Sequence, residues 1–391
     1  MNYIADLHIH SPFSRATSPD SSPAGLAAWA RLKGIQVIGT GDCTHPAWFK
    51  LLKEQLEPAE PGLYRLKDEK GIPDILPGVV QPDTPVRFLL SAEISSIYKR
   101  GGATRKVHNL LYLPDFASVE RLNARLSGIG NIVSDGRPIL GLDSRNLLEI
   151  LLECSSDAFM VPAHIWTPWF SLFGSKSGFD SIEECFGDLS NHIFALETGL
   201  SSDPDMNRLI SGLDHCALIS NSDCHSPSKL GREANLFNTG FDFFSLRDAL
   251  KQNRRDTFCG TVEFFPEEGK YHFDGHRDCK VCLDPHETRR LNNLCPVCGK
   301  PVTVGVHHRV LELADRENPV YRDNAPGFYS LIPLPEILGE LLQVGPSSKQ
   351  VIHQYGRVLS QFGSEFNLLL HADLDQINSH EPLLAEAVKR M

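Results

Sequence analysis

The sequence predicts an α/β fold with a mainly parallel sheet or barrel, followed along the chain by a small metal-binding module and a helical C-terminal region. Short apolar runs alternate with amphipathic stretches over roughly the first 265 residues, which is typical of α/β folds. The following segment is polar and turn-rich and contains two CxxC pairs, and beyond residue 308 the pattern becomes helical. We therefore expect three parts: residues 1–265, 266–308 and 309–391.

The main domain begins with a strand over Tyr3–Ile9. Ser22 precedes Pro23, and this pair predicts a helix N-cap and a first-turn proline, with the helix ending at Gly34. A Pro-rich stretch over 57–85 is predicted to be irregular. The remaining strands are expected over 35–39, 87–94, 107–113, 158–162, 193–198 and 216–221, and the helices over 46–57, 146–154 and 244–252.

The C-terminal region is predicted to contain helices over 335–343, 347–362 and 382–390. Between the first two lies Gly345–Lys349, which allows either a phosphate-binding hairpin or an ordinary turn with a serine N-cap. Serine caps are common, so the ordinary turn is favoured.

Composition narrows the class of protein. A chain of 391 residues with 41% hydrophobic and 22% charged residues is neither disordered, collagen-like nor a coiled coil. The 38 Lys and Arg residues against 49 Asp and Glu residues give a formal net charge of -11. This balance argues against a protein that coats nucleic acid, but an enzyme can still meet DNA through local basic patches and bound metal.

No signal peptide or membrane span is expected, since the opening MNYIADLHIH lacks a basic start and the chain has no long apolar run. Four of the ten cysteines fall in the CxxC pairs. In a chain of this length that pattern indicates metal rather than disulfides, and a cytoplasmic location is expected.

Metal-competent side chains follow nearly every predicted strand. The carboxyl ends of strands in α/β folds are where ligands converge, and buried charges are paired or coordinate metal. His8 and His10 alternate by two and so point to the same side of an extended strand. The candidate ligands are His8, His10, Asp42, His45, Glu93, His108, His164, Glu197, Asp223 and His225.

Two of these candidates have alternative interpretations. Glu197 is either a ligand or a carboxylate that orients one, and His45 is either a ligand or the cap of the helix that begins at Pro46. Any single histidine is more often a hydrogen-bonded core residue. The set as a whole predicts two or three divalent ions, with Zn, Mn, Mg or Fe as candidates.

The two CxxC pairs predict a structural zinc site formed by Cys279, Cys282, Cys295 and Cys298. Four thiolates leave no open coordination position. We therefore expect this zinc to stabilise a segment that is too polar to fold alone.

Candidate DNA-binding residues flank two of the predicted ligands. Lys99, Arg100, Arg105 and Lys106 form a basic loop before His108. Trp166 and Trp169 directly follow His164 and provide aromatic surface for base stacking. The alternatives are a solvated basic loop and an aromatic core.

The ordered motifs His8-x-His10, Gly41-Asp42, Glu93, His108, His164 and Asp223-x-His225 resemble the polymerase-and-histidinol-phosphatase (PHP) superfamily. The resemblance covers residues 1–260 and implies a distorted (β/α)7 barrel that hydrolyses phosphoesters with bound metals. It implies that His8, His10, Glu93 and Asp223 hold one ion, and that Glu93 bridges to a second held by His108 and His164. Asp42, His225 and His45 would hold a third, with Cys43 standing where the family often has histidine. The implied catalytic residues are His8, His10, Glu93, Asp223 and His225.

The whole chain is similar to the endonuclease Q family, through the blocks over 6–18, 39–42, 105–109 and 222–226. The resemblance implies a DNA-repair enzyme that nicks damaged DNA on the 5′ side of uracil, hypoxanthine, xanthine or an abasic site. The alternatives are a small-molecule phosphoesterase of the histidinol-phosphate type and a non-catalytic DNA-binding adaptor. Protein partners and oligomeric state are not predicted.

Overall fold

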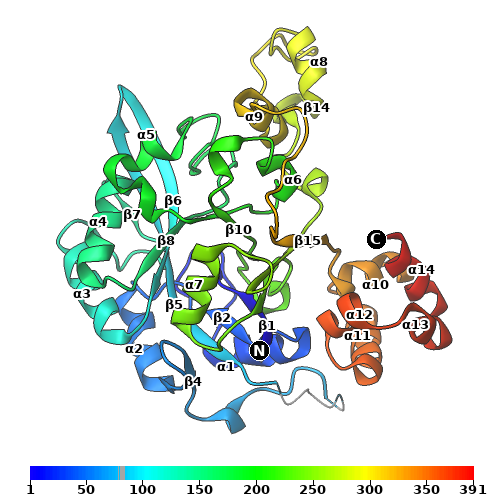
Figure 1. The fold of residues 1–391 in the computed structure, drawn as a ribbon. Helices are drawn as coiled ribbons and strands as arrows, with labels where there is room; N and C mark the ends of the chain where they lie inside the picture. Colours follow the sequence, from blue (N-terminus) through cyan, green and yellow to red (C-terminus); the bar gives the residue numbers. More distant parts are fainter. Residues whose placement is uncertain (78, 80–83) are drawn as a thin grey trace.

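A computed structural model describes residues 1–77, 79 and 84–391 and shows an α/β fold around one large sheet (Figure 1). Two further pairs of strands are separate from this sheet: β9 (Ala195–Glu197) with β10 (Ala217–Ile219), and β13 (Asp274–His276) with β14 (Val281–Leu283). The eleven strands of the large sheet are β1 (Asn2–Asp6), β2 (Val37–Gly39), β3 (Leu56–Pro58), β4 (Tyr64–Leu66), β5 (Arg87–Arg100), β6 (Ala103–Leu113), β7 (Ile139–Leu140), β8 (Phe159–Pro162), β11 (Ala234–Asn238), β12 (Phe258–Glu263) and β15 (Gly327–Ser330).

The sheet is mixed, which corrects the expectation of a mainly parallel one. Parallel pairs join β1 to β2 and β2 to β5, but β6 runs antiparallel to both β5 and β8, and β11 runs antiparallel to β1. The cause is local. Gly101 and Gly102 both adopt positive φ and form a two-residue turn, and so short a connection joins only antiparallel strands. The predicted basic loop is therefore a β-hairpin.

Helices cover the outside of the sheet. The helix α1 (Pro23–Lys33) has the predicted bounds, because Ser22 Oγ accepts a hydrogen bond from the Gly25 amide and Gly34 ends it with a φ of 85°. Among the described residues no helix is long and apolar enough to cross a membrane. The others in this part are α2 (Pro46–Gln55), α3 (Phe116–Ser127), α4 (Ser144–Cys154), α5 (Ile182–Phe186), α6 (Pro204–Asn207) and α7 (Phe243–Gln252).

The strands enclose a packed core of their own. Alternate residues such as Leu7, Val37, Leu110, Val161 and Ile219 belong to one buried apolar cluster, contributed by β2, β6, β8, β10 and the segment after β1. Side chains of one face of each strand thus meet inside, as in a filled barrel. The structure supports the α/β class, whereas the seven-unit barrel count stays a prediction.

The C-terminal part is not wholly helical, because β15 joins the large sheet in parallel with β12. Figure 1 shows the CxxC segment, with α8 and α9, projecting from one end and α10–α14 packed at one side. The domain boundaries at 265 and 308 stay a prediction. The helices here are α8 (Pro285–Arg290), α9 (Val306–Leu313), α10 (Leu334–Leu342), α11 (Lys349–Phe362), α12 (Glu365–His371), α13 (Leu374–His380) and α14 (Pro382–Arg390).

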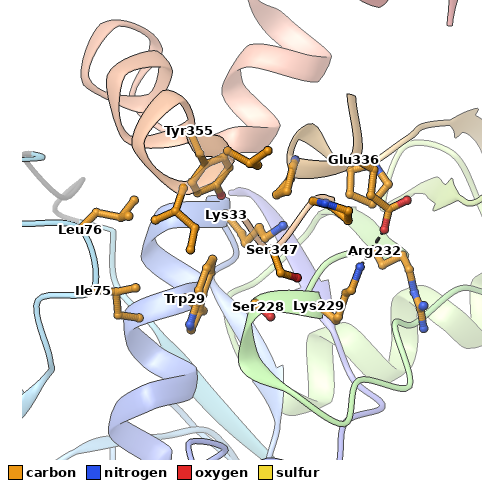
Figure 2. Close-up of a pocket in the computed structure, with 15 residues that line it drawn as sticks. Trp29, Lys33, Ile75, Leu76, Ser228, Lys229, Arg232, Glu336, Ser347 and Tyr355 are labelled. Carbon is orange, nitrogen blue, oxygen red and sulfur yellow. Dashed lines mark hydrogen bonds and ion pairs between the residues drawn. The ribbon is translucent and has the colours of Figure 1, made fainter. Parts of the chain in front are cut away.

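A buried ion pair joins α1 to the C-terminal helix α12. Lys33 of α1 lies 2.6 Å from a carboxylate oxygen of Glu365, and the Tyr355 hydroxyl donates to the same carboxylate at 2.7 Å. Figure 2 shows the adjoining cavity, of about 300 Å³, between α1, α11 and the segment that carries Lys229. Lys229 forms an ion pair with Glu336 at 2.8 Å. Ser348 caps α11, so the turn before α11 has the predicted serine cap.

Candidate metal centre

Two groups of buried and half-buried side chains meet at the ends of several strands and share Glu93. Within each group the candidate ligand atoms lie within 4.8 Å of one another. Glu93 lies in β5 and His108 in β6, whereas the other members follow β1, β8 and β10, so five strands bring the ligands together. One group is His8, His10, Glu93 and Asp223, and the other is Glu93, His108 and His164.

The first group has the properties of a cation site. Among the described residues, His8 Nε2, His10 Nε2 and Asp223 Oδ1 are buried polar atoms without a hydrogen-bond partner. They face one another, with His10 Nε2 3.0 Å and His8 Nε2 3.5 Å from that Asp223 oxygen. Unpaired buried polar atoms are costly, and a cation between them would remove the cost. The nitrogen and oxygen donors suit Zn, Mn or Fe.

Glu197 orients two of the predicted ligands. Its carboxylate accepts the His8 Nδ1–H at 3.0 Å and the His164 amide at 2.8 Å, while the Asn221 amide group donates at 2.8 Å. A proton held at Nδ1 leaves the His8 Nε2 lone pair free to bind metal. The structure therefore favours the orienting role of Glu197 over the ligand role.

Asp42 holds His10 in the same way. One oxygen lies 3.1 Å from His10 Nδ1, and the other accepts hydrogen bonds from the Ser11 amide, the Ser11 hydroxyl and the Ser14 hydroxyl at 2.7, 2.6 and 2.9 Å. Burial raises the pKa of Asp42, but His10 and these donors outweigh it and leave the pKa lowered. Both oxygens are thus in use, and Asp42 lies outside the two ligand groups.

The predicted third ion finds no gathered ligand set in the described part of the chain. His45 uses both ring nitrogens: Nδ1 accepts from the Trp48 amide at the start of α2, and Nε2 donates to the Val133 carbonyl at 3.0 Å. This is the capping alternative. His225 donates from Nδ1 to the Asp223 carbonyl at 3.0 Å and also lies outside the two groups.

The second group is centred on one oxygen of Glu93. His108 Nδ1 lies 2.6 Å and His164 Nε2 3.3 Å from Glu93 Oε1. Burial lowers the pKa of His108 to about 4, although Glu93 opposes this shift, and a lowered pKa favours the neutral imidazole that a metal ligand requires.

Backbone strain marks the same place. Asp42, His164 and Asp223 all have positive φ, at 48°, 30° and 47°, which is unfavourable for residues with a Cβ. Burial lowers the pKa of His8, but Glu197, Asp223 and Glu93 raise it well above its usual value. The surrounding carboxylates thus favour a positive charge at this place.

A cavity of about 710 Å³ opens onto the ligands, and its walls include Arg137, Trp169 and Tyr271. Sequence reasoning missed Arg137, whose guanidinium lies 3.1 Å from Glu93 Oε2. Arg137 lies in an irregular segment between α3 and β7 without a motif, so no sequence signal marks it.

The two predicted stacking residues differ in the structure. Trp166 is 1% exposed and its indole Nε1–H donates to Asn207 at 2.8 Å, which favours the alternative of an aromatic core for this residue. Trp169 is 42% exposed and lines the cavity. Trp169 therefore remains a candidate for stacking on a base.

The basic residues lie along the β5–β6 hairpin. Arg100 donates to the Cys185 carbonyl, and Arg105 donates to the Gly178 carbonyl and lies 4.3 Å over the Phe179 ring. These two arginines hold the hairpin against the barrel. Lys99 is exposed, and Lys106 lies 5.2 Å from the Phe170 ring beside His108.

The CxxC segment brings together three of the four predicted cysteines and a histidine. His276, Cys279, Cys295 and Cys298 place their ligand atoms within 4.8 Å of one another. Cys282 is exposed and lies outside this group. In the β13–β14 pair, Cys282 is opposite Gly275 and Val281 is opposite His276, so Cys282 and His276 point to opposite faces. This departs from the predicted set of four cysteines.

Two fully buried glutamates, Glu233 and Glu263, predict an effect of pH on stability. Burial raises the pKa of Glu263 from 4.5 to about 7, and Glu233 is also fully buried with a raised pKa. The neutral carboxyl is the favoured folded form, so its stabilising effect is complete below the usual glutamate pKa and is lost as pH rises through about 7. The Tm of Glu263→Gln minus the Tm of wild type should therefore increase by several degrees from about pH 5 to about pH 8, because glutamine stays neutral. An unchanged difference in Tm, measured by calorimetry at both pH values, would contradict this assignment.

Comparisons with known proteins place the chain in a family. A model described as the MJ0043 C-terminal domain matches residues 333–391. The chain is 33% identical over 233 residues to the uncharacterized protein MJ0043 of Methanocaldococcus jannaschii, covering 57% of this chain but only 28% of that protein. It is 30% identical over 346 residues to the uncharacterized protein YqxK of Bacillus subtilis, covering 87% of this chain and 79% of that one.

Two solved structures match over the whole chain. The lesion-specific endonuclease PfuEndoQ from Pyrococcus furiosus has a TM-score of 0.85 and 33% identity, covering 100% of this chain and 90% of that one. An endonuclease Q bound to a 27-mer duplex with an abasic lesion at the active site has a TM-score of 0.84 and 33% identity, covering 100% and 91%. With this fold, coverage and identity, the chain belongs to the endonuclease Q family.

Proposed function

We propose that this chain is a metal-dependent DNA-repair endonuclease that hydrolyses the phosphodiester on the 5′ side of a deaminated base or an abasic site. The observation that carries the proposal is the set of unpartnered ligand atoms of His8, His10 and Asp223 beside a cavity of about 710 Å³. The membership of this chain in the endonuclease Q family supports the proposal, since one solved structure of the family is a lesion-specific endonuclease and a second shows an endonuclease Q with an abasic lesion of a duplex at its active site.

The proposed reaction is a hydrolysis. A water oxygen bonds to phosphorus, the bond between phosphorus and the 3′ oxygen breaks, and the products are a 3′-hydroxyl and a 5′-phosphate. Divalent ions held by the two ligand groups would polarise the phosphoryl group and lower the pKa of the attacking water. Glu93 belongs to both groups, so its carboxylate would set the spacing between the ions. Glu197 and Asp42 hold His8 and His10 in the tautomer that presents Nε2.

A second cavity offers a place for a flipped base. It measures about 530 Å³, lies beside the first and shares Trp169 and Tyr271 with it. Its far wall is formed by the CxxC segment, including His276 and Val281. A damaged or mispaired base costs less to flip out than a normal one, so a pocket beside the scissile phosphate would favour lesions.

The test uses the purified protein with Mn²⁺ or Mg²⁺ and 5′-labelled duplexes that contain one uracil, one hypoxanthine or one abasic site, beside an undamaged duplex. We expect a single nick 5′ to the lesion and a 3′-hydroxyl that a polymerase can extend. Release of phosphate from histidinol phosphate without nicking would favour a small-molecule phosphoesterase instead. Binding of DNA without hydrolysis of either substrate would favour an adaptor.

Trp169→Ala should reduce nicking of lesion duplexes about tenfold or more, because stacking of a base on an aromatic side chain contributes about 1–3 kcal/mol. Trp169→Phe keeps a ring at this exposed position and should retain most of the activity. The measurement is kcat/KM on the abasic duplex, with hydrolysis of bis(p-nitrophenyl) phosphate as the control that needs no stacking. Equal loss on both substrates would contradict a role in base binding.

A further inference from the structure

Arg137 brings a positive charge to the candidate metal centre. Its guanidinium donates to Glu93 Oε2 at 3.1 Å, and it lines the same cavity as His108, His164 and Asp223. The side chain is 30% exposed, so it reaches from the buried cluster to the open cavity. Among the described residues it is the arginine or lysine with an ion pair to a member of the two ligand groups.

The segment that carries Arg137 is tied to the barrel on both sides. The Gly136 amide donates to the Phe13 carbonyl at 2.9 Å, and the Ser95 amide of β5 donates to the Pro138 carbonyl at 3.0 Å. A Cβ at Gly136 would lie 2.3 Å from Asp42 Oδ2, so the backbone approaches the site as closely as glycine allows. The position of Arg137 is therefore set before any ligand binds, which lowers the cost of ordering it.

The hydrogen bond between Arg137 and Glu93 belongs to the protein without metal or substrate. Divalent ions would bind the Glu93 carboxylate. The guanidinium would then lie beside two cations, and their repulsion is unfavourable unless an anion binds between them. A phosphodiester is such an anion, and the planar guanidinium matches two phosphate oxygens in a bidentate hydrogen-bonding pattern. In phosphoryl transfer the negative charge on these oxygens needs stabilising in the transition state.

The other two basic residues that line the cavity are placed differently. Arg232 donates to the Ser222 carbonyl at 2.9 Å, and the Lys270 ammonium lies 5.3 Å from the Tyr271 ring. Neither forms an ion pair with the ligand groups in the part of the chain that the structure describes. They are suited to the flanking backbone of a bound strand rather than to the reacting phosphate.

We propose that Arg137 is a catalytic residue that binds the non-bridging oxygens of the scissile phosphate, after exchanging its hydrogen bond with Glu93 for one with the substrate. This inference rests on the proposed phosphodiesterase function and adds a residue to it. In this proposal Arg137 binds the substrate phosphate, and the candidate metal ligands remain those of the two groups.

The test compares Arg137→Gln and Arg137→Lys with wild type on the abasic duplex and on bis(p-nitrophenyl) phosphate. We expect Arg137→Gln to lower kcat on both substrates about 100-fold, the usual cost of removing one such donor, while the bound metal per chain stays at the wild-type value. Arg137→Lys keeps the charge without the bidentate geometry and should recover part of kcat. The inhibition constant of inorganic phosphate should rise at least about tenfold in Arg137→Gln, since the charge-assisted hydrogen bonds of the guanidinium are lost.

Arg125→Gln is the matched control, because it removes an exposed arginine from α3, whose ion pair with the exposed Glu153 involves neither ligand group. It should leave kcat unchanged. Loss of barrel metal in Arg137→Gln would overturn the proposal and make Arg137 a structural partner of Glu93, and so would unchanged kcat and phosphate inhibition. Wild type that hydrolyses only the small diester would contradict the proposed DNA endonuclease function. If Arg137→Gln loses that hydrolysis as well, the proposed role of Arg137 in binding the phosphate is still supported.

Discussion

Glu93→Gln is expected to abolish nicking, with a loss in kcat of at least about 1,000-fold. The metal contribution to transition-state stabilisation is several kcal/mol, and each 1.36 kcal/mol changes the rate tenfold. Glu93 is the residue shared by both ligand groups and is 2% exposed, so its replacement should weaken both ion sites together. The amide has nearly the same size as the carboxylate and should preserve the fold.

The measurement is metal analysis of the purified variant together with kcat and thermal unfolding. The barrel ions should be lost, while the ion of the CxxC segment is retained because its ligands are separate. Glu120→Gln is the control, since Glu120 is exposed on α3 and pairs only with Lys53. Full metal content with normal nicking in Glu93→Gln would remove Glu93 from the centre.

His276→Ala and Cys298→Ser are expected to release the metal of the CxxC segment, whereas Cys282→Ser should keep it. The reason is the strand register, which turns His276 toward the other ligands and Cys282 away from them. Among the described residues, the segment's own buried apolar cluster is small, with Leu283, Cys295 and Val302, so we expect the segment to need a bound metal in order to fold. We expect zinc affinity to fall at least about 100-fold when a ligand is replaced.

Zinc content and hydrogen exchange over residues 274–308 test this prediction, with DNA affinity as a second readout. The two ligand variants should lose zinc and exchange rapidly there, and bind lesion DNA more weakly, while the barrel stays protected. A Cys282→Ser variant without zinc, or a His276→Ala variant with it, would show that four cysteines hold the ion.

Local patterns predicted much of this molecule. The bounds of α1 follow from Ser22, Pro23 and Gly34, because capping depends on neighbours in sequence. His8 and His10 were predicted to act together from their spacing alone, since the strand period is two. The β5–β6 hairpin was missed, although its Gly101-Gly102 turn is also local, because the basic side chains suggested a loop.

The sequence by itself determined the α/β class, the family and the side chains able to bind metal, since these depend on composition, period and order of motifs. Only the tertiary structure separated the side chains whose candidate ligand atoms lie close together from those that hold these ligands in place. Glu197 and Asp42 form hydrogen bonds with His8 and His10. His45 caps α2. His276 lies within the group of cysteines from which Cys282 is absent. The physical reason is that a carboxylate or imidazole has few hydrogen-bonding atoms. Their partners come from strands far away in sequence, so packing alone determines how they are used.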